Sequence, residues 1–354
     1  MADRIPLILD VDTGIDDALA LLYAAASPDA ELLAVTCVAG NVEAREVAAN
    51  TLAVLELAGR DDVPVALGAD RPLVKALQTT PETHGPHGIG YAELPVARRA
   101  LEPGHAADRI VALARARPRE ITLVTLGPLT NLAIALEREP ALPRLLRRHV
   151  LMGGAYRSPG NTTPTTEWNL HVDPDAGRAV FAAWAEALAE DPSIERPLAM
   201  GLDVTEQARL LPAHLGRLAL RAGASARDAG VFASEPVRLT GAVADNSVLR
   251  FVGDALRFYF EFHDRYDGFY GAFIHDPFVV AAALDASLIQ TQPVFVDVET
   301  GPGLAHGMTV ADWRGITGKP ANLDVAIEAD AERFIDQLIE RVGALAAARA
   351  AVAR

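Results

Sequence analysis

The sequence predicts an α/β fold with an open, mostly parallel central sheet and helices on both faces. Short apolar segments of strand length alternate with longer helix-like segments through the first half of the chain, and this alternation is typical of parallel sheets. Acidic and amide residues follow several of the strand-like segments, where open α/β sheets bind ligands. Half of the 354 residues are hydrophobic, and no repeat, linker or break in composition divides them. We therefore expect one domain over residues 1–354.

The first half shows the alternation most clearly. Pro28 and Gly59 each end a helix-like segment, as these residue types do at helix C-termini. The stretch 68–103 is rich in Gly, Pro and His and is expected to be an irregular loop with short helical pieces. The expected strands are 5–9, 31–38, 64–67, 121–126 and 149–152, and the expected helices are 16–26, 42–58, 106–115 and 130–137.

The second half is less regular. We expect a polar loop over 153–169, helical pieces broken by Gly and Pro over 207–256, and an aromatic helix over 257–265. The remaining expected strands are 198–202, 294–298 and 308–310, and the remaining expected helices are 174–188, 276–284 and 329–342, the last with an Ala-rich tail over 343–354.

Composition limits the possible partners. The formal net charge is −15, and phosphate backbones repel an acidic protein, so no nucleic acid partner is expected. No uncharged apolar stretch reaches the roughly 18 residues that span a membrane, so no membrane partner is expected. Cys37 is the only cysteine. It permits neither an intramolecular disulfide nor a cysteine zinc cluster, and the expected compartment is a reducing cytoplasm.

Four aspartates lie within eight positions directly after the first apolar segment. They are Asp10, Asp12, Asp16 and Asp17. A helix cap would explain any one of them, but four carboxylates this close repel one another unless a cation lies among them. Oxygen ligands of this kind are those that a hard divalent cation prefers. The cluster therefore predicts a metal site at the carboxyl end of the first strand.

The stretch 10–18 resembles the N-terminal signature D-x-D-P-G-x-D-D-A of the inosine–uridine-preferring nucleoside hydrolase family. All four acidic positions match, and Thr13 stands where the signature has a proline, which would fix φ. The resemblance implies hydrolysis of the N-glycosidic bond of ribonucleosides such as inosine, uridine and cytidine, with Ca²⁺ as the cofactor. It also implies a small-molecule ribonucleoside partner, a homodimer or homotetramer, and a role in nucleoside catabolism or salvage.

Later segments match further motifs of the same family, in the same order. Each is weak alone, but together with the aspartate signature they make the resemblance specific. The matches are 40–41 (G-N), 83–88 (H-G-x-x-G, with His87 where an acidic residue is common), 126–131 (G-P-L-T-N after Leu126), 151–154, 160–161 and 167–169 (M-G-G, G-N and E-F-N, with Trp168 for Phe) and 274–277 (His-Asp before a helix).

The resemblance implies a role for each matching residue. Asp12 is the expected general base, because it can touch both metal and water. His275 is the expected acid for the leaving base, because an imidazole titrates near neutrality. The implied metal ligands are Asp12, Asp17, the Leu126 carbonyl and Asp276, supported by Asp10, and the implied substrate contacts are Asp16, Asn41, His84, Met152, Asn161, Glu167, Trp168 and Asn169.

Two other functions fit parts of the sequence. A strand followed by D-x-D resembles haloacid-dehalogenase-type phosphatases, whose motif D-x-D-x-T/V has a hydroxyl or branched residue where Gly14 stands here. That motif has no place for Asp16 and Asp17. A catalytically silent calcium- and nucleoside-binding protein would keep the binding residues without turnover. Phosphate release would favour the phosphatase, and ribose binding without hydrolysis would favour the binding protein.

Overall fold

A computed structural model describes residues 4–234 and 245–352 of the chain. The strands are β1 (Ile5–Val11), β2 (Ala30–Cys37), β3 (Val65–Leu67), β4 (Thr122–Thr125), β5 (Arg148–Met152), β6 (Leu198–Met200), β7 (Arg209–Leu210), β8 (Ala272–Phe273), β9 (Ile289–Val294), β10 (Val296–Val298), β11 (Thr309–Ala311) and β12 (Leu323–Ala329). The helices are α1 (Ile15–Ala26), α2 (Ala44–Leu57), α3 (Pro81–His84), α4 (Ala106–Ala116), α5 (Thr130–Arg138), α6 (Leu142–Leu145), α7 (Trp168–Val172), α8 (Pro174–Glu190), α9 (Leu202–Thr205), α10 (Pro212–Arg221), α11 (Ala226–Phe232), α13 (Ser247–Asp267), α14 (Asp276–Leu284) and α15 (Ala331–Val352), with a 3-10 turn η1 (Ala286–Leu288).

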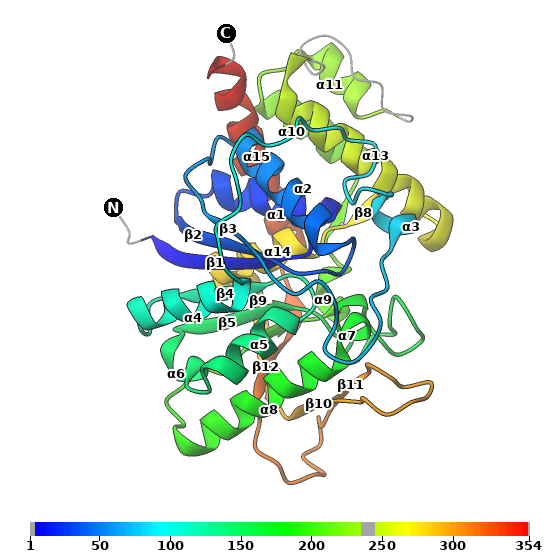
Figure 1. Ribbon diagram of the computed structural model, residues 1–354. Coiled ribbons are helices and arrows are strands. Elements are labelled where there is room, and N and C mark those ends of the chain that lie inside the picture. Colours follow the sequence, from blue (N-terminus) through cyan, green and yellow to red (C-terminus); the bar gives the residue numbers. More distant parts are fainter. Residues whose placement is uncertain (1–3, 235–244, 353–354) are drawn as a thin grey trace.

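The expected α/β fold is confirmed. Eight strands form one sheet in the order β3-β2-β1-β4-β5-β6-β12-β9 (Figure 1). Neighbouring strands pair in parallel, except that β9 runs antiparallel to β12 at one edge. Two antiparallel pairs, β7 with β8 and β10 with β11, lie outside this sheet.

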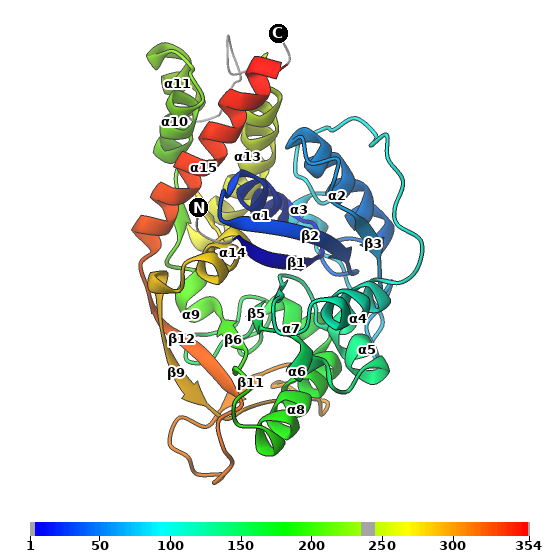
Figure 2. The same ribbon diagram turned by 90° about the vertical axis from the view of Figure 1, so that its left-hand side faces the viewer.

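Helices cover both faces of the sheet, as expected. One hydrophobic core lies under α1, α2, α14 and α15, and a second lies under α4, α5 and α8 on the other face (Figure 2). Helix α1 is buried from Ile15 to Ala24, because it contacts α2, α14 and α15 as well as the sheet. A helix packed on several sides needs apolar residues all round rather than on one stripe.

The expected elements of the first half are confirmed to within two residues at each end. Two expectations for the second half are wrong. The aromatic helix begins at Ser247 rather than 257, because the Asn246 side chain caps it by accepting from the N–H groups of Val248 and Leu249. The single strand 294–298 is two strands, β9 and β10. The strand expected over 198–202 is confirmed to within two residues, and it ends early because Leu202 begins α9.

The C-terminal helix was expected from residue 329, but Ala329 ends strand β12, which the sequence analysis missed. This strand joins the parallel part of the sheet to its antiparallel edge. Part of the expected broken helical region, 235–244, and the end of the expected tail, 353–354, lie outside the described residues.

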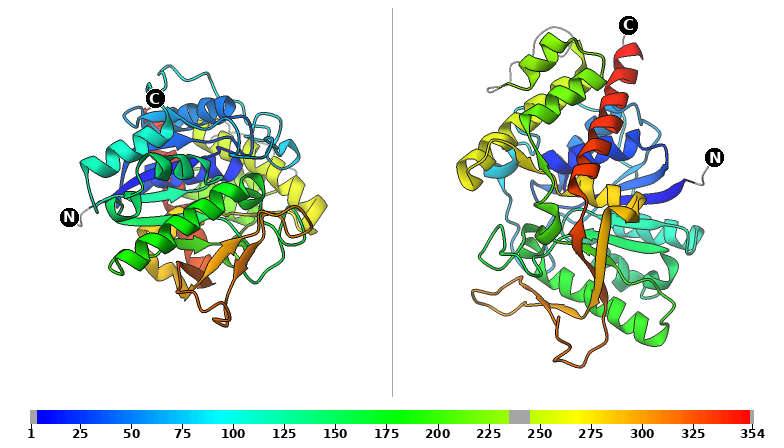
Figure 3. Two further views of the ribbon diagram at one scale, coloured as in Figure 1. Left: turned by 60° about the horizontal axis from the view of Figure 1, so that its bottom comes forward. Right: turned by 180° about the vertical axis from the view of Figure 1, so that it is seen from behind.

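Two features of this fold position the site. The carboxyl ends of the central strands meet at one edge, where Asp10 of β1 is paired with Thr36 of β2 and Thr125 of β4. In addition, α13 packs against α15 and crosses to α3 beside that edge (Figure 3). The segments that follow β1, β2, β4 and β5 therefore meet at this edge of the sheet. Helix α13, from a distant part of the sequence, lies next to them.

Candidate active site

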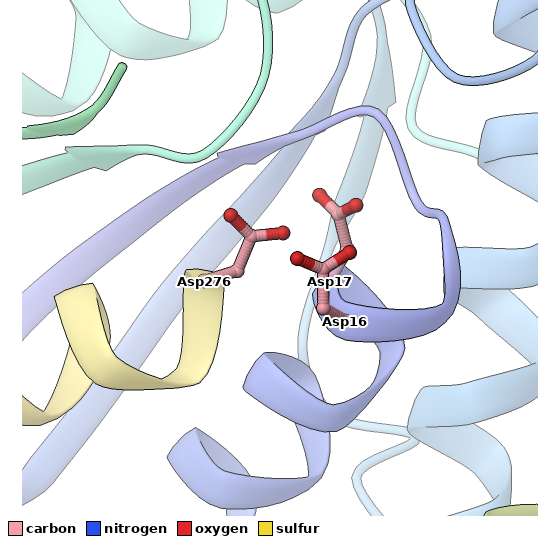
Figure 4. A group of neighbouring side chains, drawn as sticks. All are labelled: Asp16, Asp17 and Asp276. Carbon is pink, nitrogen blue, oxygen red and sulfur yellow. The ribbon is translucent and has the colours of Figure 1, made fainter. Parts of the chain in front are cut away.

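Carboxylates from two helices meet in one buried group. Asp16 and Asp17 lie in the first turn of α1, and Asp276 is the first residue of α14. One oxygen of each carboxylate lies within 4.8 Å of the others, and Figure 4 shows the side chains gathered at the adjoining helix ends. This group contains Asp16, which the resemblance assigns to ribose. The expected ligand Asp12 adjoins the group, because its side chain interacts with Asp17.

The loop after β1 holds Asp17 in place. Its carboxylate accepts hydrogen bonds from the backbone N–H of Asp12 at 3.1 Å and of Gly14 at 2.9 Å, and from Asn41 Nδ2 at 3.3 Å. Hydrogen bonds to an ionised acceptor are among the stronger ones in proteins. They fix this carboxylate relative to the end of β1, and they place Asn41 beside the acidic group.

Glycines make room for the Asp12 carboxylate. Its Oδ2 accepts from the backbone N–H of Asn41 at 2.8 Å. A Cβ atom on Gly40 would lie 2.1 Å from Oδ2, and one on Gly127 would lie 2.8 Å from Oδ1. Taken alone, the sequence gives Gly40 no role beyond a turn. The structure shows that the absence of side chains at Gly40 and Gly127 allows Asp12 to occupy its position.

Asp10 is held from the neighbouring strand and from α5. Its Oδ1 accepts from Thr36 Oγ1 at 2.6 Å and from Asn131 Nδ2 at 2.8 Å. Its Oδ2 is buried and has no hydrogen-bond partner among the described residues. Thr36 and Asn131 are two supporting residues to which the sequence analysis gave no role. A through-space contact with Asp10 identifies them, and no local motif does.

Burial shifts the acidic pKa values upward. It raises the pKa of Asp10 to about 7, and burial together with the charge of Asp17 raises that of Asp16 to about 8. The pKa values of Asp12 and Asp276 lie well above the usual range, first because of burial and then because of repulsion from neighbouring aspartates. Full ionisation of this group is therefore unfavourable without a nearby positive charge.

The residues present fit a hard divalent cation. The donor set consists of carboxylate oxygens within a few ångströms of one another, and one buried oxygen, Asp10 Oδ2, has no hydrogen-bond partner in the described part of the chain. No sulfur takes part, since Cys37 is buried and its Sγ contacts the Thr51 hydroxyl. Oxygen-only donors of this kind suit Ca²⁺ or Mg²⁺ better than softer metals.

A cavity of about 640 Å³ opens beside the acidic group. Asp12, Asp16 and Asp276 line it together with the polar ends of the central strands. Asn169 Nδ2 donates to the Leu126 carbonyl at 2.6 Å and lies 3.3 Å from the Met152 carbonyl. The structure thus brings together these expected site residues in one cavity: Asp12, Asp16, Asn41, His84, Leu126, Met152, Asn161, Glu167, Trp168, Asn169, His275 and Asp276.

Glu167 and Asn161, two residues of this set in the loop before α7, differ in burial and in their hydrogen-bond partners. Glu167 is buried and caps α7, because its carboxylate accepts from the N–H groups of Asn169 and Leu170 and from that of Gly154. Asn161 is exposed, and its Oδ1 accepts from the backbone N–H of Trp168 at 3.1 Å. Glu167 therefore already has a structural role, and Asn161 lies at the solvent side of the cavity.

The two expected histidines are buried and uncharged. Burial, reinforced by neighbouring histidines, lowers the pKa of His84 and of His275 to about 3. His84 Nδ1 accepts from the backbone N–H of Ile15 at 3.1 Å, and His275 Nδ1 lies 2.8 Å from Thr205 Oγ1. The expectation that His275 titrates near neutrality does not hold in this environment. A hydrogen bond from His275 to a substrate must therefore use the single N–H of the neutral imidazole. By contrast, His87 is exposed and pairs with Glu46 away from the cavity.

One face of α13 forms an aromatic side of the cavity that the sequence analysis did not assign. The lining residues on this helix recur at spacings of three and four, which places them on one helix face. The period was visible in the expected helix 257–265, but nothing local showed that this face would reach the site. The lining residues on α13 are Tyr259, Phe262, His263, Tyr266 and Asp267, and Glu206 and Phe273 line the cavity from other elements.

Within the described parts of the chain, no helix is long and apolar enough to cross a membrane.

An open α/β sheet with a buried carboxylate group, convergent amides and a small-molecule cavity at its carboxyl edge has the features of an enzyme that acts on a small polar substrate. The chain belongs to the inosine-uridine preferring nucleoside hydrolase family, whose sequence model matches residues 7–336. It is therefore an N-glycosidase that hydrolyses ribonucleosides. The phosphatase alternative is set aside by this result.

Individual relatives match nearly the whole chain. The pyrimidine-specific ribonucleoside hydrolase RihA of Salmonella paratyphi B is 36% identical over 340 residues, which cover 96% of this chain and 98% of the relative. RihA of Citrobacter koseri shows the same identity and coverage. The structure of a purine-preferring ribonucleoside hydrolase from Gardnerella vaginalis is similar with a TM-score of 0.83 at 29% identity, covering 97% of this chain and 99% of that one. These relatives are named for different bases, so similarity alone leaves the base to be determined from the cavity.

Proposed function

We propose that the protein uses bound Ca²⁺ to hydrolyse the N-glycosidic bond of uridine-, cytidine- and inosine-type ribonucleosides, releasing ribose and the free base. The observation that carries this proposal is the buried group of Asp16, Asp17 and Asp276 beside a cavity of about 640 Å³. Such a volume lies within the range of small-molecule sites. The relatives named pyrimidine-specific support uridine and cytidine as the preferred substrates.

The proposed ligands of the ion are Asp12, Asp17, Asp276 and the Leu126 carbonyl, with Asp10 in support. When bound, Ca²⁺ would hold the ribose 2′- and 3′-hydroxyls and lower the pKa of the attacking water. Asp12 would take the proton from that water, because it lines the cavity and lies beside the acidic group. Its hydrogen bond from the Asn41 N–H would fix the direction of the carboxylate.

The ribose would be oriented by side chains that converge from separate segments. Amides donate and accept, and carboxylates accept, so together they match the hydroxyls of a sugar. Well-oriented neighbours can remove roughly 7–11 kcal/mol of an activation barrier. The proposed ribose contacts are Asp16, Asn41, Asn161, Glu167 and Asn169, with Met152, Trp168 and His84 against the sugar and base.

His275 would assist the leaving base as its acid by donating a hydrogen bond to it. The Thr205 hydroxyl has one hydrogen and two acceptors within reach, the Gly201 carbonyl at 3.2 Å and His275 Nδ1 at 2.8 Å. In the proposed arrangement this hydrogen goes to Nδ1. Nε2 would then carry the ring hydrogen of the neutral imidazole and could donate it. Buried in this way, His275 would act as a hydrogen-bond donor to the base before cleavage rather than as a charged imidazolium.

Release of free ribose tests the proposal. Purified protein is incubated with uridine, cytidine, inosine or adenosine, in added Ca²⁺ and again after chelation. Calcium-dependent ribose release, fastest from the pyrimidine ribonucleosides, is expected. Ribose release that survives complete chelation would refute the role of the metal. Substrate binding without release of ribose would show a silent binding protein instead.

Three further features remain predictions. These are a single domain over residues 1–354, a homodimer or homotetramer, and a cytoplasmic location with a role in nucleoside catabolism or salvage. Light scattering on the purified chain tests the oligomeric state, and limited proteolysis tests the single domain, since a linker between domains would be cleaved first.

A further inference from the structure

A histidine–aspartate pair on α13 faces the cavity without a part in the chemistry described above. His263 Nδ1 lies 2.6 Å from Asp267 Oδ2, one helical turn further along. Both residues line the cavity. His263 is only 4% exposed, and its Nε2 is buried without a hydrogen-bond partner among the described residues. A buried polar atom that no protein group satisfies is costly, and here the adjoining cavity can supply the partner.

The pairing fixes which ring nitrogen carries the hydrogen. A carboxylate only accepts, so Nδ1 must donate to Asp267. Burial outweighs the effect of Asp267 and lowers the pKa of His263, so the imidazole is neutral at pH 7. In a neutral ring with hydrogen on Nδ1, Nε2 has a lone pair. His263 therefore offers an acceptor, and its partner must be a donor.

The surroundings favour a flat ligand with a hydrogen-bond donor. Tyr259 and Phe273 lie 4.7 and 5.0 Å from the His263 ring, centroid to centroid, and both line the cavity. Aromatic side chains of this kind pack well against a planar ring. Glu206 also lines the cavity, and burial together with the charge of Asp267 raises its pKa to about 7. Acidic groups around an acceptor make a donor on the ligand more favourable.

The other titratable groups near His263 do not satisfy Nε2. His84 and His275 are close enough for each to interact electrostatically with His263. His84 Nδ1 is used by the Ile15 N–H, and His275 Nδ1 by Thr205. The three imidazoles thus line the same cavity, and neither His84 Nδ1 nor His275 Nδ1 is available to His263 Nε2.

We propose that His263 Nε2 accepts a hydrogen bond from a ring N–H on the edge of the nucleobase, with Asp267 as the positioning residue that fixes the tautomer. The proposal rests on the function proposed above and names the group that selects the base. The uracil N3–H is the simplest such donor, and the hypoxanthine N1–H is an equivalent one. A pyrimidine with an acceptor at N3, such as cytosine, lacks this contact.

Substrate pairs isolate the contact. Uridine and 3-methyluridine differ in the N3–H, and a 4-nitrophenyl riboside has no base donor and an activated leaving group. In calcium-loaded His263→Phe, which keeps an aromatic ring, kcat/KM for uridine is expected to fall about tenfold or more, as for loss of one hydrogen bond. The values for 3-methyluridine and the nitrophenyl riboside should stay within about threefold of wild type, because neither makes the contact.

Two further variants separate recognition from packing. Phe269 stacks on His263 at 5.6 Å without lining the cavity. The control Phe269→Leu should therefore leave the ratio of uridine to nitrophenyl riboside unchanged. The amide of Asp267→Asn can donate to Nδ1 as well as accept from it, so the ring hydrogen is no longer held on Nδ1 and can move to Nε2. This variant should shift selectivity from uridine toward cytidine, a change that a purely structural role would not produce.

Equal losses on uridine, 3-methyluridine and the nitrophenyl riboside in His263→Phe would overturn the inference, and so would unchanged uridine turnover. Release of nitrophenol by the wild-type protein shows separately that the riboside bond is cleaved. If wild type cleaves none of the three substrates, the proposed function fails, and that result is distinct from a loss of base selectivity.

Discussion

Replacement of Gly40 by alanine tests whether the position of the Asp12 carboxylate limits the reaction. The new Cβ would lie 2.1 Å from Asp12 Oδ2 and 2.9 Å from Pro128 Cδ, whereas ordinary contacts of a Cβ begin beyond about 3.4 Å. To restore an ordinary contact the carboxylate must move by about 1 Å, because the Cβ also lies close to the proline ring and has little room to shift. Misplacement by about 1 Å commonly costs on the order of 10²-fold in rate.

The assay is kcat/KM for uridine in saturating Ca²⁺, with a thermal melt and a calcium titration on the same sample. Gly40→Ala is expected to lose about 10²-fold in kcat/KM. Gly230→Ala is the matched control, since a Cβ there meets nothing within 4 Å. Activity of Gly40→Ala within threefold of wild type would refute the reasoning.

A double variant shows that the clash is with Asp12. If the carboxylate is the clashing group, Gly40→Ala should lower the melting temperature in the wild-type background but much less in the Asp12→Ala background. Equal losses in both backgrounds would place the strain elsewhere, for example against Pro128.

Three other predictions concern the same site. Asp12→Asn should lower kcat by at least about 10²-fold with an unchanged melting temperature, and near-wild-type turnover would contradict its role as base. His275→Ala should lower kcat/KM for inosine by about 10²-fold but leave a 4-nitrophenyl riboside within about threefold, and equal losses would remove His275 as the acid. Folding raises the pKa of Asp10 to about 7 and that of Asp16 to about 8, from 3.8. Their contribution to the free energy of unfolding is therefore fully present below pH 3.8, where both groups are protonated in either state, and it is lost as the pH rises through 7 to 8. The chelated protein should therefore melt at a lower temperature at pH 8.5 than at pH 6, and Ca²⁺ should raise the melting temperature more at pH 8.5; a calcium effect independent of pH would contradict this assignment.

The sequence alone determined the fold class and the acidic centre. Apolar runs, helix ends and the residues that follow each strand are local properties. In the first half of the chain they located each strand and each long helix to within two residues. The spacing of Asp10, Asp12, Asp16 and Asp17 likewise indicated a metal site, because repulsion between neighbouring charges can be read from the chain itself. The family resemblance, now confirmed, supplied the order of the later motifs.

Tertiary structure decided what depends on packing between distant segments. It brought Asp276, from a distant part of the sequence, against Asp16 and Asp17, and it showed why Gly40 must lack a side chain. Burial moved the pKa of His275 far from neutrality, and the approach of α13 to α3 brought the His263–Asp267 pair to the cavity. Desolvation and through-space contacts set these properties, and neither can be read from the order of residues, since both depend on which elements lie against one another once the chain has folded.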